Sequence, residues 1–203
     1  AKLLVDPYAK ALTGGVDWAR GSPFSYPLGH AEGDLARDDS DDAAAVPKSI
    51  VVDDSFDWAG DRPPRVPWQR LVIYELHVKG FTAMFPGLDP QLRGTYASLA
   101  APAVLDYLLR LGVTAVELLP VQASLPEKFL TDRGLTNYWG YNTLGYFAPE
   151  GRYSASGSRG GQVVEIPCFR NVPPQPLRAG VAVGFLHGRK IGIQRQDVKP
   201  PER

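Results

Sequence analysis

The sequence has few of the side chains on which redox or metal chemistry depends. Among 203 residues there is one cysteine, Cys168, and there are three histidines, His30, His77 and His187. A single cysteine excludes an internal disulfide and suits a reducing compartment, so we expect a cytoplasmic protein. The three histidines are scattered without metal-ligand spacing. We therefore expect neither a metal site nor a cofactor.

Long apolar runs and an excess of charge are also absent. No stretch of about 18 apolar residues occurs, which argues against a transmembrane helix. The first residues, AKLLVDPYAK, lack the apolar region of a signal peptide. They begin with Ala rather than Met, which suggests trimming or a fragment. The formal net charge is zero, so nothing points to nucleic acid or a membrane as a partner. No feature of the sequence indicates an oligomeric state.

The zero net charge conceals a change of composition near Glu165. Residues 166–203 contain seven Lys or Arg, two Asp or Glu and six of the nineteen prolines, for a net charge of +5. Residues 1–165 hold the remaining 15 basic and 20 acidic side chains, for a net charge of −5. This boundary predicts that the last 38 residues differ in kind from the rest.

Residues 1–66 are rich in turn signals. DDSDDAAAVPKS lacks the ligand spacing and the glycine of a calcium-binding loop, so we interpret it as a solvated loop. SIVVDDSFDW favours a short strand followed by a turn. DRPPRVPW is stiffened by proline and predicts a linker.

A strand–helix–strand pattern follows. LVIYELHV (71–78) is rich in β-branched and aromatic residues and predicts a strand. PAVLDYLLRLG (102–112) has apolar residues at helical spacing, Pro102 in its first turn and Gly112 at its end. VTAVELLPV (113–121) is a near-continuous apolar run, which is typical of a buried strand. The pattern predicts an α/β fold with two parallel strands joined by a right-handed crossover.

Aromatic residues are concentrated in NYWGYNTLGYFAP (137–149), which does not alternate like a strand and is interpreted as a connection. It follows the carboxyl end of the second predicted strand, where ligands of parallel α/β units bind. Flat rings with polar edges match the C–H faces and hydroxyl rim of a sugar. The alternative, a tyrosine-rich loop that folds over its own core, has equal weight from the residues alone.

Other polar residues do not form a convincing site. Glu75 and His77 are two apart in the first predicted strand and are expected on one face, and Glu117 lies in the second. A catalytic trio can be drawn from them. We favour polar groups that pair with each other or with backbone. YSASGSRGG is interpreted as a flexible loop, since no Gly-Lys-Ser/Thr follows it.

The order of YELHVKGFT, RGTYASLA, YLLRLGVTAVELLPV and GLTNYWGYNTLGYFAP resembles the glycogen debranching and isoamylase group of the α-amylase superfamily over residues 1–165. The resemblance implies an α/β fold, a partial (β/α)8 TIM barrel of which the chain supplies the first two strands. Residues 1–66 would be the end of a β-sandwich domain and a linker, and residues 67–165 the first β/α units of the barrel.

The resemblance also implies an activity and a partner. Family members hydrolyse α-1,6 branch linkages of glycogen or limit dextrin with retention of configuration, using two carboxyl groups about 5–5.5 Å apart. Tyr141 matches the tyrosine that stacks under the sugar at the cleavage subsite, and Tyr138, Trp139 and Asn142 are expected to line the groove. The family's catalytic carboxylates have no counterparts in this chain, so we assign no catalytic residue and expect the chain alone to be inactive.

Residues 166–203 depart from the family pattern, because Pro173, Pro174 and Pro176 exclude the helix expected there. Out-of-frame translation and a natural, basic, disordered tail are both open explanations. Two other functions also stay open. One is a non-catalytic glucan-binding module, and the other is a part of a branching enzyme or of a trehalose-releasing relative.

Overall fold

The computed structural model describes residues 1–53, 55, 57 and 66–168. Its elements are, in chain order, η1 (Gly33–Leu35), η2 (Trp68–Arg70), β1 (Ile73–Leu76), α1 (Val78–Thr82), α2 (Tyr96–Leu99), α3 (Pro102–Arg110), β2 (Ala115–Leu118), β3 (Gln122–Ser124), α4 (Lys128–Thr131), β4 (Thr143–Pro149), η3 (Gly151–Tyr153) and α5 (Gln162–Cys168). The strands form two separate two-stranded sheets, β1–β2 and β3–β4.

The predicted parallel strand pair is confirmed. β1 pairs with β2 in parallel, with Ile73 opposite Ala115 and Leu76 opposite Leu118. Both strands are shorter than the apolar runs that predicted them. Three helices, α1, α2 and α3, lie between them in the sequence, so the connection is longer than a single helix.

Helix α3 forms where its local signals place it. Pro102 occupies the first turn, and Gly112 follows the last turn with φ 76°, the left-handed conformation that glycine adopts without strain. The apolar stripe of α3 is buried in the main core. That core consists of Leu76, Val78, Leu88, Tyr96, Leu99, Val104, Leu105, Leu108, Val113, Val116 and Tyr153. Burial of each large apolar side chain contributes about 1.5–3 kcal/mol, so tertiary packing is the main support of this short helix.

The interpretation of residues 137–149 as a connection is wrong for its second half. Residues Thr143–Pro149 form β4, which pairs antiparallel with β3. The register shifts on both sides of Ala123, and the burial pattern of β4 does not alternate with a period of two. Because such irregular pairing removes the alternation that identifies a strand, the sequence pattern gave no signal for it.

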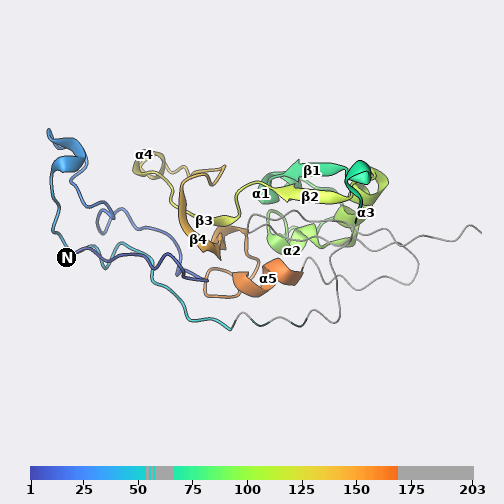
Figure 1. Ribbon diagram of the computed structural model, residues 1–203, viewed down its shortest axis with the longest axis horizontal. Helices are drawn as coiled ribbons and strands as arrows, with labels where there is room; N and C mark the ends of the chain where they lie inside the picture. Colours follow the sequence, from blue (N-terminus) through green and yellow to red (C-terminus); the bar gives the residue numbers. More distant parts are fainter. Residues whose placement is uncertain (54, 56, 58–65, 169–203) are drawn as a thin grey trace, which may run out of the picture.

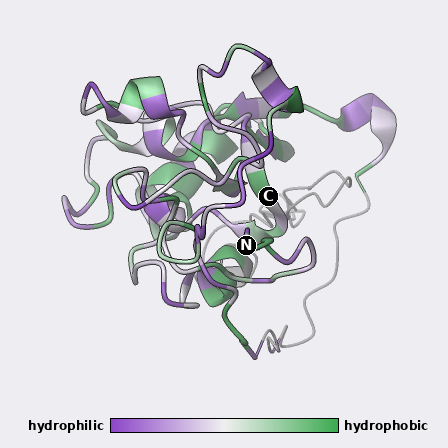
Figure 2. Cartoon of the chain, turned by 90° about the vertical axis from the view of Figure 1, so that its left-hand side faces the viewer, coloured by the Kyte–Doolittle hydropathy of each residue, from purple (hydrophilic) through white to green (hydrophobic). Residues whose placement is uncertain are grey.

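The N-terminal segment packs against this second sheet. Ala9, Leu12, Ala123 and Ala148 form a smaller buried cluster. In Figure 1 the β3–β4 sheet accordingly lies between the N-terminal segment and the β1–β2 unit. Figure 2 shows hydrophobic ribbon mainly on the central helices and hydrophilic ribbon mainly along the outer loops.

The expected strand in SIVVDDSFDW is not formed in its described part. Residues 50–53 have no regular structure, and the local pairing is one isolated antiparallel bridge between Leu12 and Ser49. The described part of residues 1–66 contains η1 but no regular strand, so the β-sandwich stays a prediction. Most of the predicted tail, residues 169–203, lies outside the described residues. Most of the predicted linker, residues 61–65, also lies outside them.

Within the described ranges, no helix has the length and apolar character needed to cross a membrane.

Candidate functional site

The loop formed by residues 137–142, called the aromatic loop below, is held at the carboxyl ends of both parallel strands. His77 follows β1 directly, and its Nε2 lies 2.8 Å from the carbonyl oxygen of Tyr138. Pro120 lies just beyond β2, and its Cβ would be 3.4 Å from a Cβ built on Gly140. The sheet edge that the βαβ pattern predicted as a ligand site therefore carries the aromatic loop.

Three rings of the aromatic loop face solvent over a large part of their surface. The exposed fractions are 43% for Tyr138, 55% for Trp139 and 69% for Tyr141. Trp139 packs edge-on against Tyr138, with ring centroids 5.1 Å apart and an interplanar angle of 86°. The loop thus offers exposed ring surface and phenolic hydroxyls, the combination that a sugar ring can contact on its C–H face and at its hydroxyls.

His77 orients this loop. Its ring stacks on Tyr138 with centroids 4.2 Å apart and planes only 6° from parallel. The N–H of Gly80 donates to Nδ1 at 3.0 Å, which caps the start of α1. Because Nδ1 accepts, the neutral ring carries its hydrogen on Nε2, and Nε2 donates to the Tyr138 carbonyl. The hydroxyl of Tyr153 lies 3.1 Å from the same nitrogen.

The phenol of Tyr153 completes the support beneath the loop. Burial, with a smaller contribution from the nearby Glu150, raises its pKa to about 12, so it stays protonated at neutral pH. Its ring packs edge-on against that of Tyr96 at 5.8 Å. The Tyr96 hydroxyl in turn donates toward the carbonyl oxygens of Val121, at 3.2 Å, and Glu150, at 3.1 Å. A buried column of rings therefore connects the aromatic loop to the main core.

The expectation that Glu75 and His77 share one face of a strand is wrong. β1 ends at Leu76, and the chain turns into α1 at His77, so Glu75 is exposed whereas His77 is buried. Glu75 lies opposite Glu117 in the β1–β2 register, and both are exposed. The interpretation of His77 as a polar group satisfied by its surroundings is confirmed, and the catalytic trio is not assembled.

The described residues also contain no group of three or more His, Cys, Asp or Glu side chains that could hold a metal ion.

Two functional neighbours of the loop, Glu150 and Arg152, were missed by the sequence analysis. One Glu150 oxygen, Oε2, accepts from the Ser124 backbone N–H at 3.1 Å, from the Ser124 hydroxyl at 2.9 Å and from an Arg152 nitrogen at 3.0 Å. Arg152 also donates to the Thr136 hydroxyl and, at 3.1 Å, to the carbonyl of Asn137. This ion pair ties β3 and the end of β4 to the start of the aromatic loop.

The pKa values of this pair follow from burial and hydrogen bonding. Burial alone would raise the pKa of Glu150, but the hydrogen bonds and charge of Arg152 and the hydrogen bond from Ser124 bring it below its ordinary value. The pKa of Arg152 is raised, because the contribution of Glu150 outweighs the effect of burial. Both groups are therefore charged at neutral pH. The only sequence signal for them is the charged Glu-Gly-Arg step after the aromatic segment.

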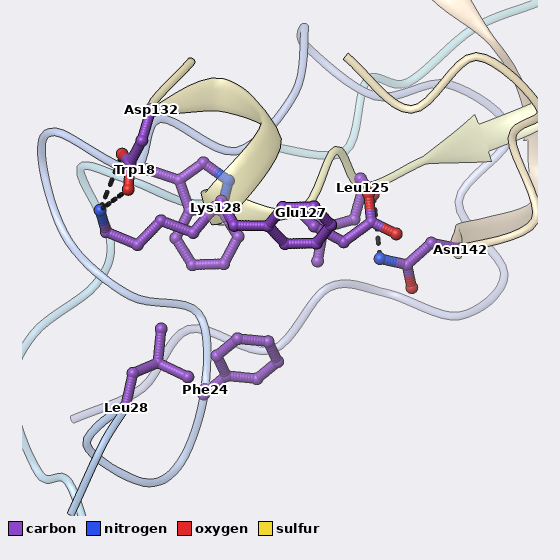
Figure 3. Close-up of a pocket in the computed structure, with 9 residues that line it drawn as sticks. Trp18, Phe24, Leu28, Leu125, Glu127, Lys128, Asp132 and Asn142 are labelled. Carbon is purple, nitrogen blue, oxygen red and sulfur yellow. Dashed lines mark hydrogen bonds and ion pairs between the residues drawn. The ribbon is translucent and has the colours of Figure 1, made fainter. Parts of the chain in front are cut away.

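Asn142 lies apart from the three rings. Its side-chain amide donates to the carbonyl of Leu125 at 2.9 Å, and it lines a pocket whose lining does not include the three rings (Figure 3). Asn137, which was not singled out, fixes the loop's conformation. Its amide nitrogen donates to both carboxylate oxygens of Glu127, and its Oδ1 accepts from the Gly140 N–H at 2.8 Å. The structure thus brings Tyr138, Trp139 and Tyr141 together and assigns Asn142 to the neighbouring pocket.

Comparison with known proteins identifies the relatives of this chain. No family model matches it. It is 47% identical over 159 residues to a glycogen debranching enzyme of Yersinia pseudotuberculosis, a match that covers 78% of this chain and 23% of that protein. The chain is a homologue of glycogen debranching enzymes. It spans about a quarter of the length of the curated relatives that it matches.

A second relative matches a longer part of this chain. The glycogen operon protein GlgX homolog of Mycobacterium bovis is 43% identical over 183 residues, or 90% of this chain and 25% of that protein. A match of 183 residues includes at least 18 residues beyond Glu165. The similarity to this relative therefore enters residues 166–203, which depart from the expected family pattern, whereas the Yersinia match is short enough to fit within residues 1–165.

Solved structures agree with this relationship. The catalytic module of the glycogen-degrading pneumococcal protein SpuA superposes with a TM-score of 0.59 and 27% identity, over 84% of this chain and 23% of that one. Pullulanase type I of Bacillus subtilis, solved with maltose, gives a TM-score of 0.54 and 26% identity over 82% of this chain and 20% of that one. This chain is thus an α/β unit that resembles part of these larger enzymes.

Proposed function

We propose that this chain forms part of a glycogen debranching glycoside hydrolase that cleaves α-1,6-glucosidic branch linkages with retention of configuration. In this proposal β1 and β2 are the first two strands of a (β/α)8 barrel. Residues 67–165 are its first β/α units, and residues 1–66 are the end of a preceding β-sandwich domain with its linker. The homology to glycogen debranching enzymes and the parallel β1–β2 pair support this assignment.

The observation that carries the proposal is the aromatic loop at the carboxyl ends of β1 and β2. Tyr141 is the most exposed of its three rings and lies next to Gly140, which is close to Pro120 just beyond β2. We assign to Tyr141 the stacking contact under the sugar at the cleavage subsite, and to Tyr138 and Trp139 the adjoining wall. An electron-rich ring face favours the cation-like sugar of the glycosidase transition state. Branched α-glucan, such as glycogen, is the proposed partner.

Glycogen binding by this chain tests the proposal. Affinity electrophoresis in gels containing glycogen compares the parent chain with Tyr141→Ala. Loss of one stacking ring costs about 1–2 kcal/mol, or about five- to thirty-fold in Kd. Tyr146→Ala is the matched control, because Tyr146 lies on β4 and is similarly exposed, at 65%. Equal mobility of the Tyr141 and Tyr146 variants in glycogen would refute the role of Tyr141.

A second candidate is a non-catalytic glucan-binding module. It is favoured by one observation: the exposed rings are present, whereas Glu75, His77 and Glu117 do not form a catalytic group. Glycogen binding together with release of reducing sugar from phosphorylase-limit dextrin by the longer natural protein would support the hydrolase. Conversion of amylose to a branched product, or release of trehalose, would instead identify the longer protein as a branching enzyme or a trehalose-releasing enzyme.

Two explanations remain open for the composition of residues 166–203. Residues 166–203 are either an out-of-frame product or a natural basic tail, and the nucleotide sequence around codon 165 decides between them. A second reading frame that encodes a homologous continuation supports the first explanation. Absence of such a continuation from the other two frames would support the second, and the match to the mycobacterial relative beyond Glu165 is consistent with it.

A further inference from the structure

A pocket lies beside the aromatic loop, on the side to which Asn142 points. It has a volume of about 390 Å³ and is lined by three rings, Trp18, Phe24 and Phe129, together with Leu28, Leu125 and Asn142. In Figure 3, Phe24 and Leu28 lie across the cavity from Trp18 and Lys128. We call it the Trp18 pocket. Its volume is at the lower end of the range for small-molecule sites.

The walls of the Trp18 pocket are fixed by contacts between distant parts of the chain. The indole N–H of Trp18 donates to the carbonyl of Pro126 at 2.9 Å, a contact between residues 108 positions apart. The Trp18 and Phe24 rings are 5.8 Å apart. The indole N–H already donates a hydrogen bond to the backbone, so Trp18 offers its ring surface to the cavity and not a free hydrogen-bond donor.

The rim of the Trp18 pocket is polar. Glu127, Lys128 and Asp132 line it, and the Lys128 ammonium bonds both oxygens of Asp132, at 2.8 and 2.7 Å. Both side chains of this ion pair are about half exposed, and such pairs contribute only about 0–1 kcal/mol. These groups can therefore turn to a ligand's hydroxyls at little cost. Ring surface inside and exchangeable charged groups at the mouth suit a sugar better than a lipid, which would leave the rim unused.

The Trp18 pocket and the aromatic loop share their connecting residues. Asn142 closes the loop and lines the pocket, and Glu127 lines the pocket while holding Asn137 at the start of the loop. The pocket therefore adjoins the same short segment that carries the exposed rings.

We propose that the Trp18 pocket is a second glucan subsite, which binds a short α-1,4-linked glucosyl chain. This inference rests on the proposed function, because it takes its ligand class from the glucan assigned to the aromatic loop. The pocket takes a free end or a short outer chain, since a volume of about 390 Å³ limits how many sugar units it can hold.

Tryptophan indole signals test both sites separately in the intact chain. The sequence has four tryptophans, of which Trp18 reports on the pocket, Trp139 on the aromatic loop and Trp68 on neither. Spectra of the ¹⁵N-labelled chain are recorded during titration with maltotriose, and the signals are assigned with Trp18→Phe and Trp139→Phe. Cellotriose, which has the same sugar units with β-1,4 linkages, is the control ligand.

Each outcome of the titration is decisive. Saturable shifts of the Trp18 and Trp139 signals, with Trp68 unchanged, support both sites. A shift of Trp139 alone overturns the second subsite and leaves the proposed function standing. A shift of Trp18 alone supports the pocket and counts against the aromatic loop. No shift, or an equal response to cellotriose, overturns the inference.

A substitution tests whether the ligand enters the pocket. Phe129 is 57% exposed, so Phe129→Ala removes a pocket wall without opening the core. It is expected to weaken the Trp18 response about five-fold while leaving that of Trp139 unchanged. Tyr146→Ala is again the control with an exposed ring outside the pocket. An unchanged Trp18 titration in Phe129→Ala would overturn the inference.

Discussion

His77 determines how the first ring of the aromatic loop is placed. One of its nitrogens caps α1 through Gly80, the other holds the Tyr138 carbonyl, and its ring face stacks on the Tyr138 ring. The hydroxyl of Tyr138 reaches over Gly80 so closely that a Cβ at that position would collide with it. A glycine inside a helix is unfavourable by about 0.5–1 kcal/mol, so this close approach gives Gly80 a physical role.

Gly80→Ala is expected to lower the free energy of unfolding by about 1 kcal/mol, because overpacking costs more than the gain in helix propensity. In the double variant Gly80→Ala/Tyr138→Phe the loss should be recovered, since without the hydroxyl the next atom of the ring is 3.4 Å away. Urea unfolding of the two single variants and the double variant measures this. If the double variant is no more stable than Gly80→Ala, the collision is not the cause.

Glu150 is the buried charge on which the neighbouring sheet depends. Its carboxylate serves two donors of Ser124 and the half-buried Arg152, and burial leaves little water to replace them. Replacement by glutamine removes the charge and turns one oxygen into a donor that faces other donors.

Glu150→Gln should therefore cost about 2–3 kcal/mol at pH 7. The pKa of Glu150 is below its ordinary value of 4.5 in the folded chain, so its stabilisation is complete above that value and is lost as the pH falls through the folded pKa. The stability difference between parent and variant should shrink below about pH 4.5. Urea unfolding between pH 7 and 3 checks this, with the exposed Glu32→Gln as control. A difference that stays constant down to pH 3 would contradict the assignment.

At the scale of elements, the aromatic loop depends on a glycine that lies close to the residues just beyond β2. Gly140 has φ 76°, a conformation that costs other residues about 1–2 kcal/mol, and it lies against Pro120 beyond β2. Gly112, at the end of α3, has the same φ of 76°, but a Cβ built there meets nothing within 4 Å. The two glycines thus share the same φ and differ in their surroundings.

Gly140→Ala and Gly112→Ala are expected to lose similar stability, about 1–2 kcal/mol each. Only Gly140→Ala should weaken glycogen binding, because the strain there is relieved by moving the loop that carries Tyr141. Thermal unfolding and affinity electrophoresis of both variants provide the comparison. Equal retention of binding by the two variants would show that the loop's conformation does not govern recognition.

The elements also differ in how far their sequences predicted them. Helix α3 was predicted because Pro102, Gly112 and its apolar spacing are local signals. β4 was not, because its pairing with β3 shifts register on both sides of Ala123 and its burial does not alternate. The end of β1 was misplaced by the apolar run through Val78, since the capping of α1 by His77 depends on a side-chain contact and not on hydropathy.

For the whole molecule, the exposed carboxylates bear on activity. Glu75 and Glu117 lie side by side on an exposed part of the β1–β2 sheet, without the buried surroundings that tune a glycosidase acid. The 203-residue chain is expected to release no reducing sugar from phosphorylase-limit dextrin or pullulan. A reducing-sugar assay with the complete relative as positive control measures this. Activity that is lost in Glu75→Gln or Glu117→Gln would show that these residues act as the catalytic carboxylates.

By itself, the sequence determined the parallel strand pair, the helix between its strands, the aromatic composition of the loop and the relationship to debranching enzymes. These features follow from local periodicity, local capping signals and motif order. Only the tertiary structure decided which partners the polar groups find. The contact of His77 with Tyr138 spans 61 positions, and that of Trp18 with Pro126 spans 108. Contacts between such distant residues arise from packing, which leaves no periodic pattern in the sequence, so the supports of the loop and the Trp18 pocket emerged only from the fold.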